Sequence, residues 1–282
     1  MKQRFKDLIK PFFYSCLQLS INTAVRSQNL KELRKKLVKI VPDVTDQYTT
    51  NVIDSPYLKT KVRSLHAFQT HLASFAINKI NENSVTVVDI GDSSGTHIQY
   101  LNGLFPNILN AYSVNLDQIA VDKINDKGLK AFNVRAEDLL DHPEFEHLSI
   151  EIFLLFETLE HLLDPIGFLR SIREPDSKYF VISVPYVKKS KVGFSQIRNE
   201  SDHRKITPEN THIFELSPSD WEIIFKFTGW EVVYRRIYRQ YPWWAKLFLI
   251  DKIWKSFDFE GFYGVVLKKS EENNKYFCEW NK

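Results

Sequence analysis

The sequence predicts an α/β fold in which a mostly parallel sheet is covered by helices. Five short runs rich in β-branched and aromatic residues alternate with segments of helical spacing. The first run, residues 85–90, is short and rich in valine, as expected of a strand buried on both faces. Strands that alternate with helices in this way are typical of parallel sheets.

A turn with two glycines follows this first run. Gly91 and Gly95 are four residues apart, and residues that can begin a helix come directly after them. Such a turn lets the backbone approach a ligand closely and directs the N–H groups of the helix start toward it. Asp89 ends the strand at the carboxyl edge of the sheet, where open α/β sheets bind their ligands.

Further strands are predicted along the chain. They are residues 111–114, 130–134, 152–156, 179–184, 230–237 and 261–267. Because the carboxyl ends of parallel strands meet at one edge of a sheet, we expect the residues after the first four strands to lie around one ligand site.

Two segments together point to a family. The first is Asp89-Ile-Gly with Gly95, and the second is Glu157-Thr-Leu-Glu-His-Leu162. Over residues 70–268 the chain resembles class I S-adenosylmethionine-dependent methyltransferases that act on small molecules and lipids. The resemblance implies a Rossmann-like seven-stranded sheet with helices on both faces, an antiparallel last strand and a helical N-terminal extension. It also implies S-adenosyl-L-methionine as the cofactor.

The resemblance assigns cofactor contacts to residues at the carboxyl ends of the strands. These are Asp89, Gly91, Asp92, Ser93, Gly95, Asn115, Asp117, Ala136, Glu137, Phe156 and Thr158. Main-chain N–H groups near Gly91 suit the carboxylate of the cofactor, and the acid Asp89 suits its ammonium group. An acceptor after the second strand suits the ribose hydroxyls, and Ala136 and Glu137 occupy the adenine region.

Three positions depart from the family pattern. Asn115 stands where an acid usually holds the ribose, although an amide oxygen can accept one hydroxyl proton. Asp117 could replace it if the turn is shifted, so both remain candidates. Ser93 stands where glycine is frequent, and Arg135 where an acid is frequent.

Two histidines are the catalytic candidates. His161 follows the fourth strand, and its ordinary pKa near neutrality suits a general base. His212 belongs to residues 211–221, which resemble the family's histidine-containing segment. Methyl transfer is an in-line displacement at an activated carbon, so a base is needed only when the acceptor must lose a proton. The alternative role for His161 is to hold the turn.

The composition indicates a globular protein that neither crosses a membrane nor binds a metal. Charged residues make up 26% and hydrophobic residues 43% of the 282 residues. No apolar run approaches 18 residues, so no spanning helix is expected. The chain is expected to be cytoplasmic, and the basic residues among 1–80 leave peripheral contact with a membrane open as an alternative to a solvated helical face. Cys16 and Cys278, near opposite termini, form neither a disulfide framework nor a metal site, and no metal is expected.

Three parts are predicted along the chain. Residues 1–70 form a helical extension or lid, residues 71–270 the methyltransferase domain, and residues 271–282 a tail. The domain carries an aromatic insertion at about 239–260 and a basic loop at 187–211. Tyr48 and Tyr57 in the extension are candidates for contact with the acceptor or, alternatively, for packing.

The sequence thus predicts a methyltransferase that acts on oxygen or nitrogen of a small-molecule, glycan or lipid-linked acceptor. Lysine and arginine outnumber acids in residues 1–80, and the loop at 187–211 is also basic, so an acceptor with an anionic part is expected. Nucleic acid is not expected as a substrate. The alternatives are a methyltransferase-like binding or scaffold protein without catalysis, and a nicotinamide-dependent oxidoreductase.

Overall fold

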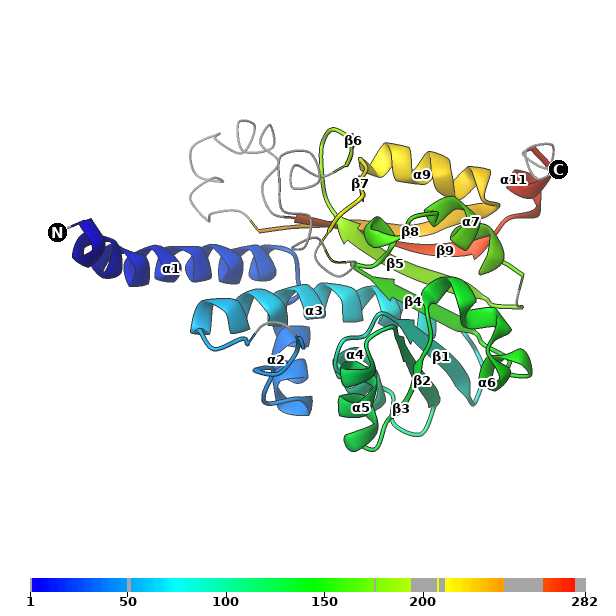
Figure 1. Cartoon of the computed structure of the whole chain (residues 1–282), viewed down its shortest axis with the longest axis horizontal. Helices are drawn as coiled ribbons and strands as arrows, with labels where there is room; N and C mark the ends of the chain where they lie inside the picture. The colour runs from blue at the N-terminus through cyan, green and yellow to red at the C-terminus, as the bar shows by residue number, and fades with distance from the viewer. Residues whose placement is uncertain are drawn as a thin grey trace.

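The computed structural model describes residues 2–49, 52–174, 176–193, 207, 211–240 and 261–276. Within these residues a seven-stranded sheet has the order β3-β2-β1-β4-β5-β9-β8 (Figure 1). Its strands are β1 (Val85–Ile90), β2 (Leu109–Asn115), β3 (Lys130–Asn133), β4 (Ile152–Phe156), β5 (Tyr179–Pro185), β8 (Trp230–Arg239) and β9 (Gly261–Lys269). The first five strands are parallel, and β9 is antiparallel to both β5 and β8. The predicted α/β fold with an antiparallel last strand is confirmed.

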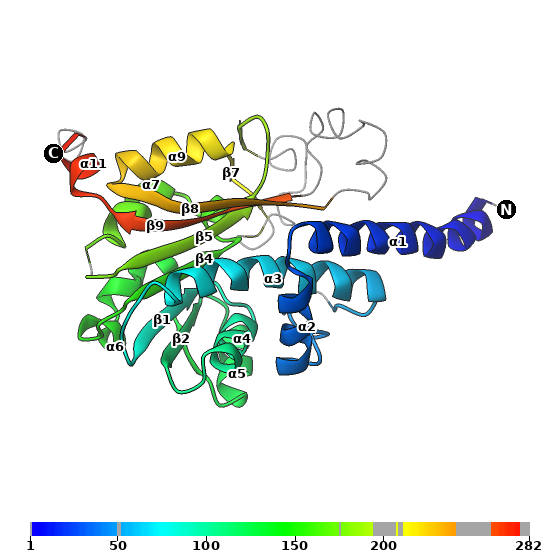
Figure 2. The same cartoon turned by 180° about the vertical axis from the view of Figure 1, so that it is seen from behind.

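Helices cover both faces of this sheet (Figures 1 and 2). The α-helices are α1 (Lys2–Ser27), α2 (Lys31–Ile40), α3 (Pro56–Ile77), α4 (Thr96–Leu104), α5 (Gln118–Asp126), α6 (Pro143–Glu146), α7 (Pro165–Ser171), α9 (Pro218–Phe227) and α11 (Glu271–Tyr276). Two short 3-10 helices are η1 (Ala136–Asp141) and η2 (Leu159–His161), and a separate two-stranded pair joins β6 (Lys191–Val192) to β7 (Phe214–Glu215).

The side chains of β4 show why both faces are covered. Phe153 and Leu155 pack in a core with residues of α7 and α9, whereas Leu154 and Phe156 pack in a second core with residues of α3 and α4. Successive residues of a strand point to opposite faces, so an entirely apolar strand needs a helical layer on each side. The apolar run therefore fixes β4 in the middle of the sheet.

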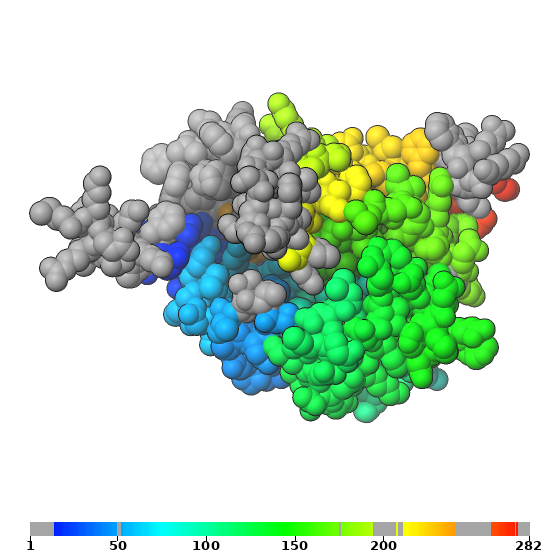
Figure 3. All heavy atoms as spheres, in the orientation of Figure 1, coloured from blue at the N-terminus to red at the C-terminus, as the bar shows by residue number. Residues whose placement is uncertain are grey.

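In the N-terminal region two helices, α1 and α2, precede α3. Residues 2–41 were expected to be largely helical, but the chain turns at Asn29, whose φ of 58° is left-handed and ends α1. Ile40 of α2 then packs against Gly103 of α4, so the extension lies on the sheet domain. Figure 3 shows the blue surface of α2 adjoining the green surface of the domain.

The predicted division of the chain differs from the observed secondary structure in two places. Residue 70 lies inside α3, a single 22-residue helix that begins at the N-cap Ser55. The predicted tail begins with the short helix α11, where the Asn273 amide donates to Ser270 Oγ. Most of the basic loop and nearly all of the aromatic insertion lie outside the described residues. No helix in the described part of the chain could span a membrane.

Candidate functional site

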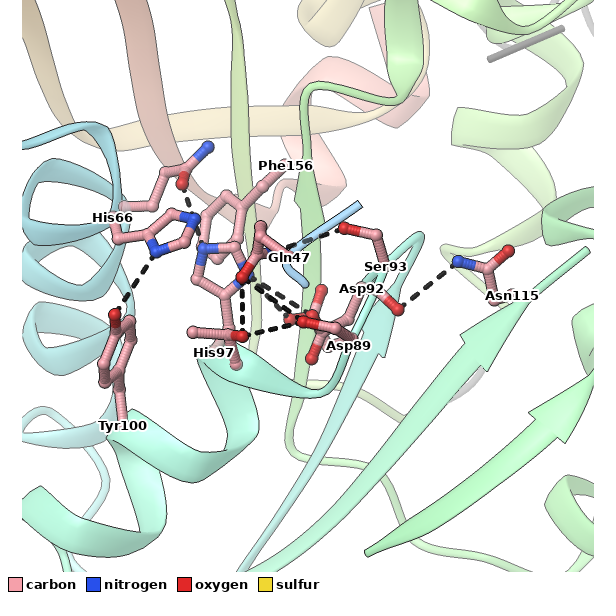
Figure 4. Close-up of polar contacts among 12 residues, drawn as sticks. Gln47, His66, Asp89, Asp92, Ser93, His97, Tyr100, Asn115 and Phe156 are labelled. Carbon is pink, nitrogen blue, oxygen red and sulfur yellow. Dashed lines mark hydrogen bonds and ion pairs between the residues drawn. The ribbon is translucent and has the colours of Figure 1, made fainter. Parts of the chain in front are cut away.

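The carboxyl end of β1 brings two buried acids and a histidine together (Figure 4). Asp89 and Asp92 are 1% and 2% exposed. Nδ1 of His97, in the first turn of α4, lies 3.5 Å from Asp89 Oδ2 and 3.8 Å from Asp92 Oδ1. We call these three residues the Asp89 cluster.

Burial controls the charge of the Asp89 cluster. It raises the pKa of Asp89 well above its ordinary value, and the charge of Asp92 adds to this. Burial also raises the pKa of Asp92 to about 6 and lowers the pKa of His97 to about 3. At neutral pH the imidazole is therefore uncharged and cannot neutralise the acids.

The Asp89 cluster contains hydrogen-bond acceptors without donors. Among the described residues, Asp89 Oδ2 and His97 Nδ1 have no hydrogen-bond partner, whereas backbone N–H groups at the start of α4 lower the pKa of Asp92 against the effect of its burial. His97 Nε2 lies 2.9 Å from Gln69 Oε1, so this nitrogen carries the proton and Nδ1 is an acceptor. An ammonium group supplies three N–H donors and a positive charge, which fits the amino-acid end of S-adenosylmethionine.

Neither glycine of the turn leaves room for a side chain. Gly91 has a φ of +91°, and a Cβ there would overlap the Thr158 hydroxyl at the end of β4. Gly95 has a φ of +72°, and its Cβ would lie 2.8 Å from Leu129 Cδ1 and 3.2 Å from Ile124 Cγ2. The space beside Gly95 is thus filled by protein, and this glycine permits close packing of α4 on α5.

A segment before α3 covers the glycine turn, a contact that was not predicted. Gln47, only 2% exposed, accepts hydrogen bonds at Oε1 from Thr96 Oγ1 (2.6 Å) and Ser94 Oγ (3.3 Å). Its Nε2 donates to Oγ of the predicted contact Ser93 (3.4 Å). A polar residue in an irregular segment carries no periodic signal, so only the folded chain reveals this contact.

The two tyrosines expected near the acceptor differ in position. Tyr57 stacks on Tyr14 with ring centroids 5.1 Å apart, so it joins α1 to α3. Tyr48 is 38% exposed and follows Gln47 directly. Partial burial and the charge of Glu157 raise the pKa of Tyr48, which indicates that it lies on the side of the site near β4.

Asn115 and Asp117 both have local partners after β2. Asn115 Nδ2 donates to the Asp92 carbonyl oxygen (3.3 Å), and Asn115 Oδ1 accepts from the Asp117 amide (2.8 Å). Asp117 is the N-cap of α5 and accepts from the Ile119 amide at 2.9 Å. Asn115 therefore contacts the glycine turn, whereas Asp117 is used for capping.

The end of β3 carries the adenine candidates and a cleft. Ala136 begins η1, and the Glu137 carboxylate pairs with Arg135 at 3.4 Å. A cleft beside them is formed by residues at the ends of β2 and β3 and in and after η1. It is lined by Leu116, Asn133, Val134, Arg135, Asp138, Asp141, His142 and Pro143. Ala136 and Glu137 are not among the lining residues.

The end of β4 is joined to the Asp89 cluster through a chain of hydrogen bonds. Gln69 Nε2 donates to Ser183 Oγ (3.1 Å), which donates to Glu157 Oε1 (2.7 Å). The Phe156 ring lies 4.9 Å from the His97 ring, between centroids. Glu157 has a left-handed φ of 51°, and burial raises its pKa to about 8.

Beyond Glu157 the structure brings both predicted catalytic histidines together. The rings of His161 and His212 are 4.8 Å apart between centroids and nearly perpendicular. His161 Nδ1 lies 2.9 Å from the Thr211 carbonyl oxygen, and His212 Nδ1 lies 2.8 Å from Glu215 Oε1. Glu160 is fully buried beside them. We call Glu160, His161 and His212 the Glu160 cluster.

A family model described as a methyltransferase domain matches residues 61–235. The matched range contains both segments on which the resemblance rests, together with the Asp89 and Glu160 clusters. Among curated proteins, no sequence matches this chain.

Solved structures share the fold at low identity. An O-methyltransferase from a multienzyme of Brevibacillus brevis, in complex with S-adenosyl-L-homocysteine, is 12% identical with a TM-score of 0.50, covering 87% of this chain and 83% of that one. A candidate sarcosine dimethylglycine methyltransferase from Galdieria sulphuraria is 14% identical with a TM-score of 0.50, covering 75% and 87%. The cyclase SpnF is 11% identical with a TM-score of 0.51, covering 88% and 97%.

Proposed function

Because this chain belongs to the methyltransferase-domain family and is a class I S-adenosylmethionine-dependent methyltransferase, we propose that it methylates oxygen or nitrogen of a small-molecule, glycan or lipid-linked acceptor. The observation that carries the proposal is the Asp89 cluster. Its buried acceptor atoms lack donors among the described residues, at the sheet edge where the family holds the amino-acid end of its cofactor.

When bound, S-adenosylmethionine supplies a methyl group on a positively charged sulfur. The chain's own residues bind and orient it: Asp89 faces the ammonium group, and the carboxylate lies at the glycine turn beyond Gly91, whose own amide donates to the Val114 carbonyl oxygen (2.8 Å). Asn115 is the ribose candidate because it contacts the glycine turn. Positioning of the acceptor in line with the methyl group then supplies much of the rate acceleration.

The acceptor lies, in this proposal, beside the end of β4. Glu157, Tyr48 and the Glu160 cluster are the polar groups on that side, and Phe156 separates them from His97. The anionic character of the acceptor is inferred from the basic sequence around Lys188, just before the β6–β7 pair, and Lys191, in β6. That part of the proposal depends on charge and not on a described contact.

Calorimetric titration tests the cofactor assignment. S-adenosylhomocysteine should bind and raise the melting temperature, and NADH should do neither. A methyl-transfer assay with labelled S-adenosylmethionine and a panel of hydroxyl and amine acceptors then tests the reaction. No binding at millimolar S-adenosylmethionine would contradict the cofactor assignment, and binding without turnover of any acceptor would favour the scaffold alternative.

A further inference from the structure

The Glu160 carboxylate is buried and without a hydrogen-bond donor in the described part of the chain. Its side chain is 0% exposed, and neither oxygen has a hydrogen-bond partner among the described residues. An ionised carboxylate taken from water without donors carries a large desolvation cost. Glu157 adds a second buried acid nearby. A buried cation would offset both costs.

The histidines beside Glu160 are held in the arrangement that metal ligands have. In each ring Nδ1 faces an oxygen acceptor, the Thr211 carbonyl for His161 and the Glu215 carboxylate for His212. Nδ1 therefore carries the proton, and Nε2 has the lone pair. A ligating histidine usually donates its other ring N–H to a carbonyl or carboxylate in this way.

The distances suit a single ion. His161 Nε2 lies 3.9 Å from Glu160 Oε1, and one ligand atom from each residue of the Glu160 cluster lies within 4.8 Å of the others. An ion about 2.0–2.2 Å from a nitrogen and an oxygen ligand fits between atoms at that separation. His212 supplies the third candidate ligand.

The backbone holds these ligands in register although 50 residues separate them. The Ile213 amide donates to the Glu160 carbonyl oxygen (2.8 Å), and the Gly193 amide donates to the Ile213 carbonyl oxygen (2.8 Å). The segment that carries His212 is thus attached to η2 on one side and to the end of β6 on the other. The ligands are positioned before any ion binds.

We propose that Glu160, His161 and His212 bind a divalent first-row transition-metal ion through the carboxylate and the two Nε2 atoms. Two imidazoles and one carboxylate leave coordination positions open and favour ions such as Mn²⁺, Fe²⁺, Co²⁺ or Zn²⁺ over Mg²⁺. The sequence led to an expectation of no metal and of histidines that accept protons. In this proposal the histidines are ligands.

The ion's use in catalysis rests on the proposed methyltransferase function. An acceptor hydroxyl held at an open position becomes more acidic and loses its proton to water. The oxygen electron pair then forms the bond to the methyl carbon, and the electrons of the broken carbon–sulfur bond remain on sulfur. Ion binding itself needs neither acceptor nor cofactor, so its failure is distinguishable from failure of the proposed function.

Cobalt titration of the chelator-treated full chain tests the site directly. Co²⁺ should bind at a single site with a visible absorption band and raise the melting temperature. Glu160→Gln and His212→Ala should abolish the band, and the exposed-histidine control His147→Ala should keep it. Absence of Co²⁺ binding in the wild type, or an unchanged band in both ligand variants, would overturn the proposal.

Two further variants locate the ion and guard against misfolding. Asp92→Asn should keep the Co²⁺ band. If the band were lost in this variant and kept in the Glu160 and His212 variants, the ion would be assigned to the Asp89 cluster and the proposal would be overturned. Glu215→Gln removes only the acceptor of the His212 ring proton and should weaken Co²⁺ about 10- to 100-fold. The circular-dichroism spectrum of each variant reports whether the fold is intact, and equal Co²⁺ affinity in a folded Glu215→Gln chain would also count against the site.

Discussion

Gln69 Oε1 lies 2.9 Å from His97 Nε2 and fixes which nitrogen of that imidazole carries the proton. The same amide donates to Ser183, so one side chain of α3 joins the ends of β1, β4 and β5. The helix that precedes the first strand is therefore part of the polar network of the site, and not only a cover for the sheet.

Gln69→Leu should weaken S-adenosylhomocysteine binding. The substitution keeps the buried volume but removes the hydrogen bonds that orient His97, at a cost of about 1–2 kcal/mol in binding free energy. Calorimetry of the variant and of Gln99→Leu, a half-buried glutamine on α4, measures the effect. Wild-type affinity in Gln69→Leu would show that the orientation of His97 does not matter for the cofactor.

Asn115→Ala and Asp117→Ala should differ in what they change. Asn115→Ala should weaken the cofactor by about 1–2 kcal/mol, the scale of one buried hydrogen bond left unmade. Asp117→Ala should instead lower the free energy of unfolding by about 1 kcal/mol, because it removes the N-cap of α5. Binding and denaturation measurements on both variants separate the two roles. The reverse ranking in affinity would assign the ribose to Asp117.

The pH dependence of stability should change in Asp92→Asn. Burial raises the pKa of Asp92 from 3.8 to about 6 in the folded chain, so the folded state binds the proton more tightly than the unfolded state. The stability that Asp92 contributes is therefore fully present below about pH 4 and lost as the pH rises through 6. Relative to the variant, the wild type should lose up to about 3 kcal/mol between pH 4 and pH 7.

Urea denaturation of the cofactor-free chain at several pH values checks this prediction. The difference between wild type and variant cancels the titrations of groups that do not sense the Asp92 charge, and the coupled change at Asp89 is part of the measured effect. The exposed aspartate variant Asp126→Asn controls for the substitution itself. A constant difference across the range would mean that Asp92 reaches solvent in the folded chain.

Gly95→Ala should destabilise the chain more than Gly128→Ala. Both glycines have a left-handed φ, +72° and +74°, which costs alanine about 1–2 kcal/mol. Only at Gly95 does the added Cβ meet protein, the Leu129 side chain at 2.8 Å, and such overpacking adds about 1–3 kcal/mol. Equal melting temperatures for the two variants would show that close packing of Leu129 on Gly95 does not matter for stability.

The double variant Lys188→Glu with Lys189→Glu should lower the specificity constant for an anionic acceptor and leave cofactor affinity intact. The reason is charge reversal beside the predicted acceptor site. Lys36→Glu with Lys39→Glu reverses two exposed charges on α2 and serves as the matched control. An unchanged specificity constant, or an equal loss of cofactor binding, would remove these lysines from acceptor recognition.

Much of the fold could be predicted because its signals are local. The apolar run of β4, the glycines after β1 and the Ser217 cap of α9 each depend on a few neighbouring residues. The family predicted from Asp89-Ile-Gly and Glu157-Thr-Leu-Glu-His-Leu162 is confirmed by the matched domain model. The break at Asn29 was missed because a single asparagine in the left-handed region leaves no mark on helical periodicity.

The sequence predicted individual residues of the site but not how they lie relative to one another. His161 and His212 were singled out separately, but their approach depends on the hydrogen bond from the Ile213 amide to the Glu160 carbonyl oxygen, which no spacing in the sequence encodes. Gln69 and Ser183 are ordinary polar residues in a helix and a strand, and only the register of α3 on the sheet makes them partners. The individual cofactor contacts remain predictions.

The contacts of Gln47 have a consequence for how the site opens. Its side chain is bonded to Thr96, Ser94 and Ser93, so the segment between α2 and α3 cannot separate from the glycine turn without breaking these bonds together. Local fluctuations of the turn and of this segment are therefore one cooperative event. One side chain in the segment before the first strand therefore stabilises the closed position of both the segment and the glycine turn.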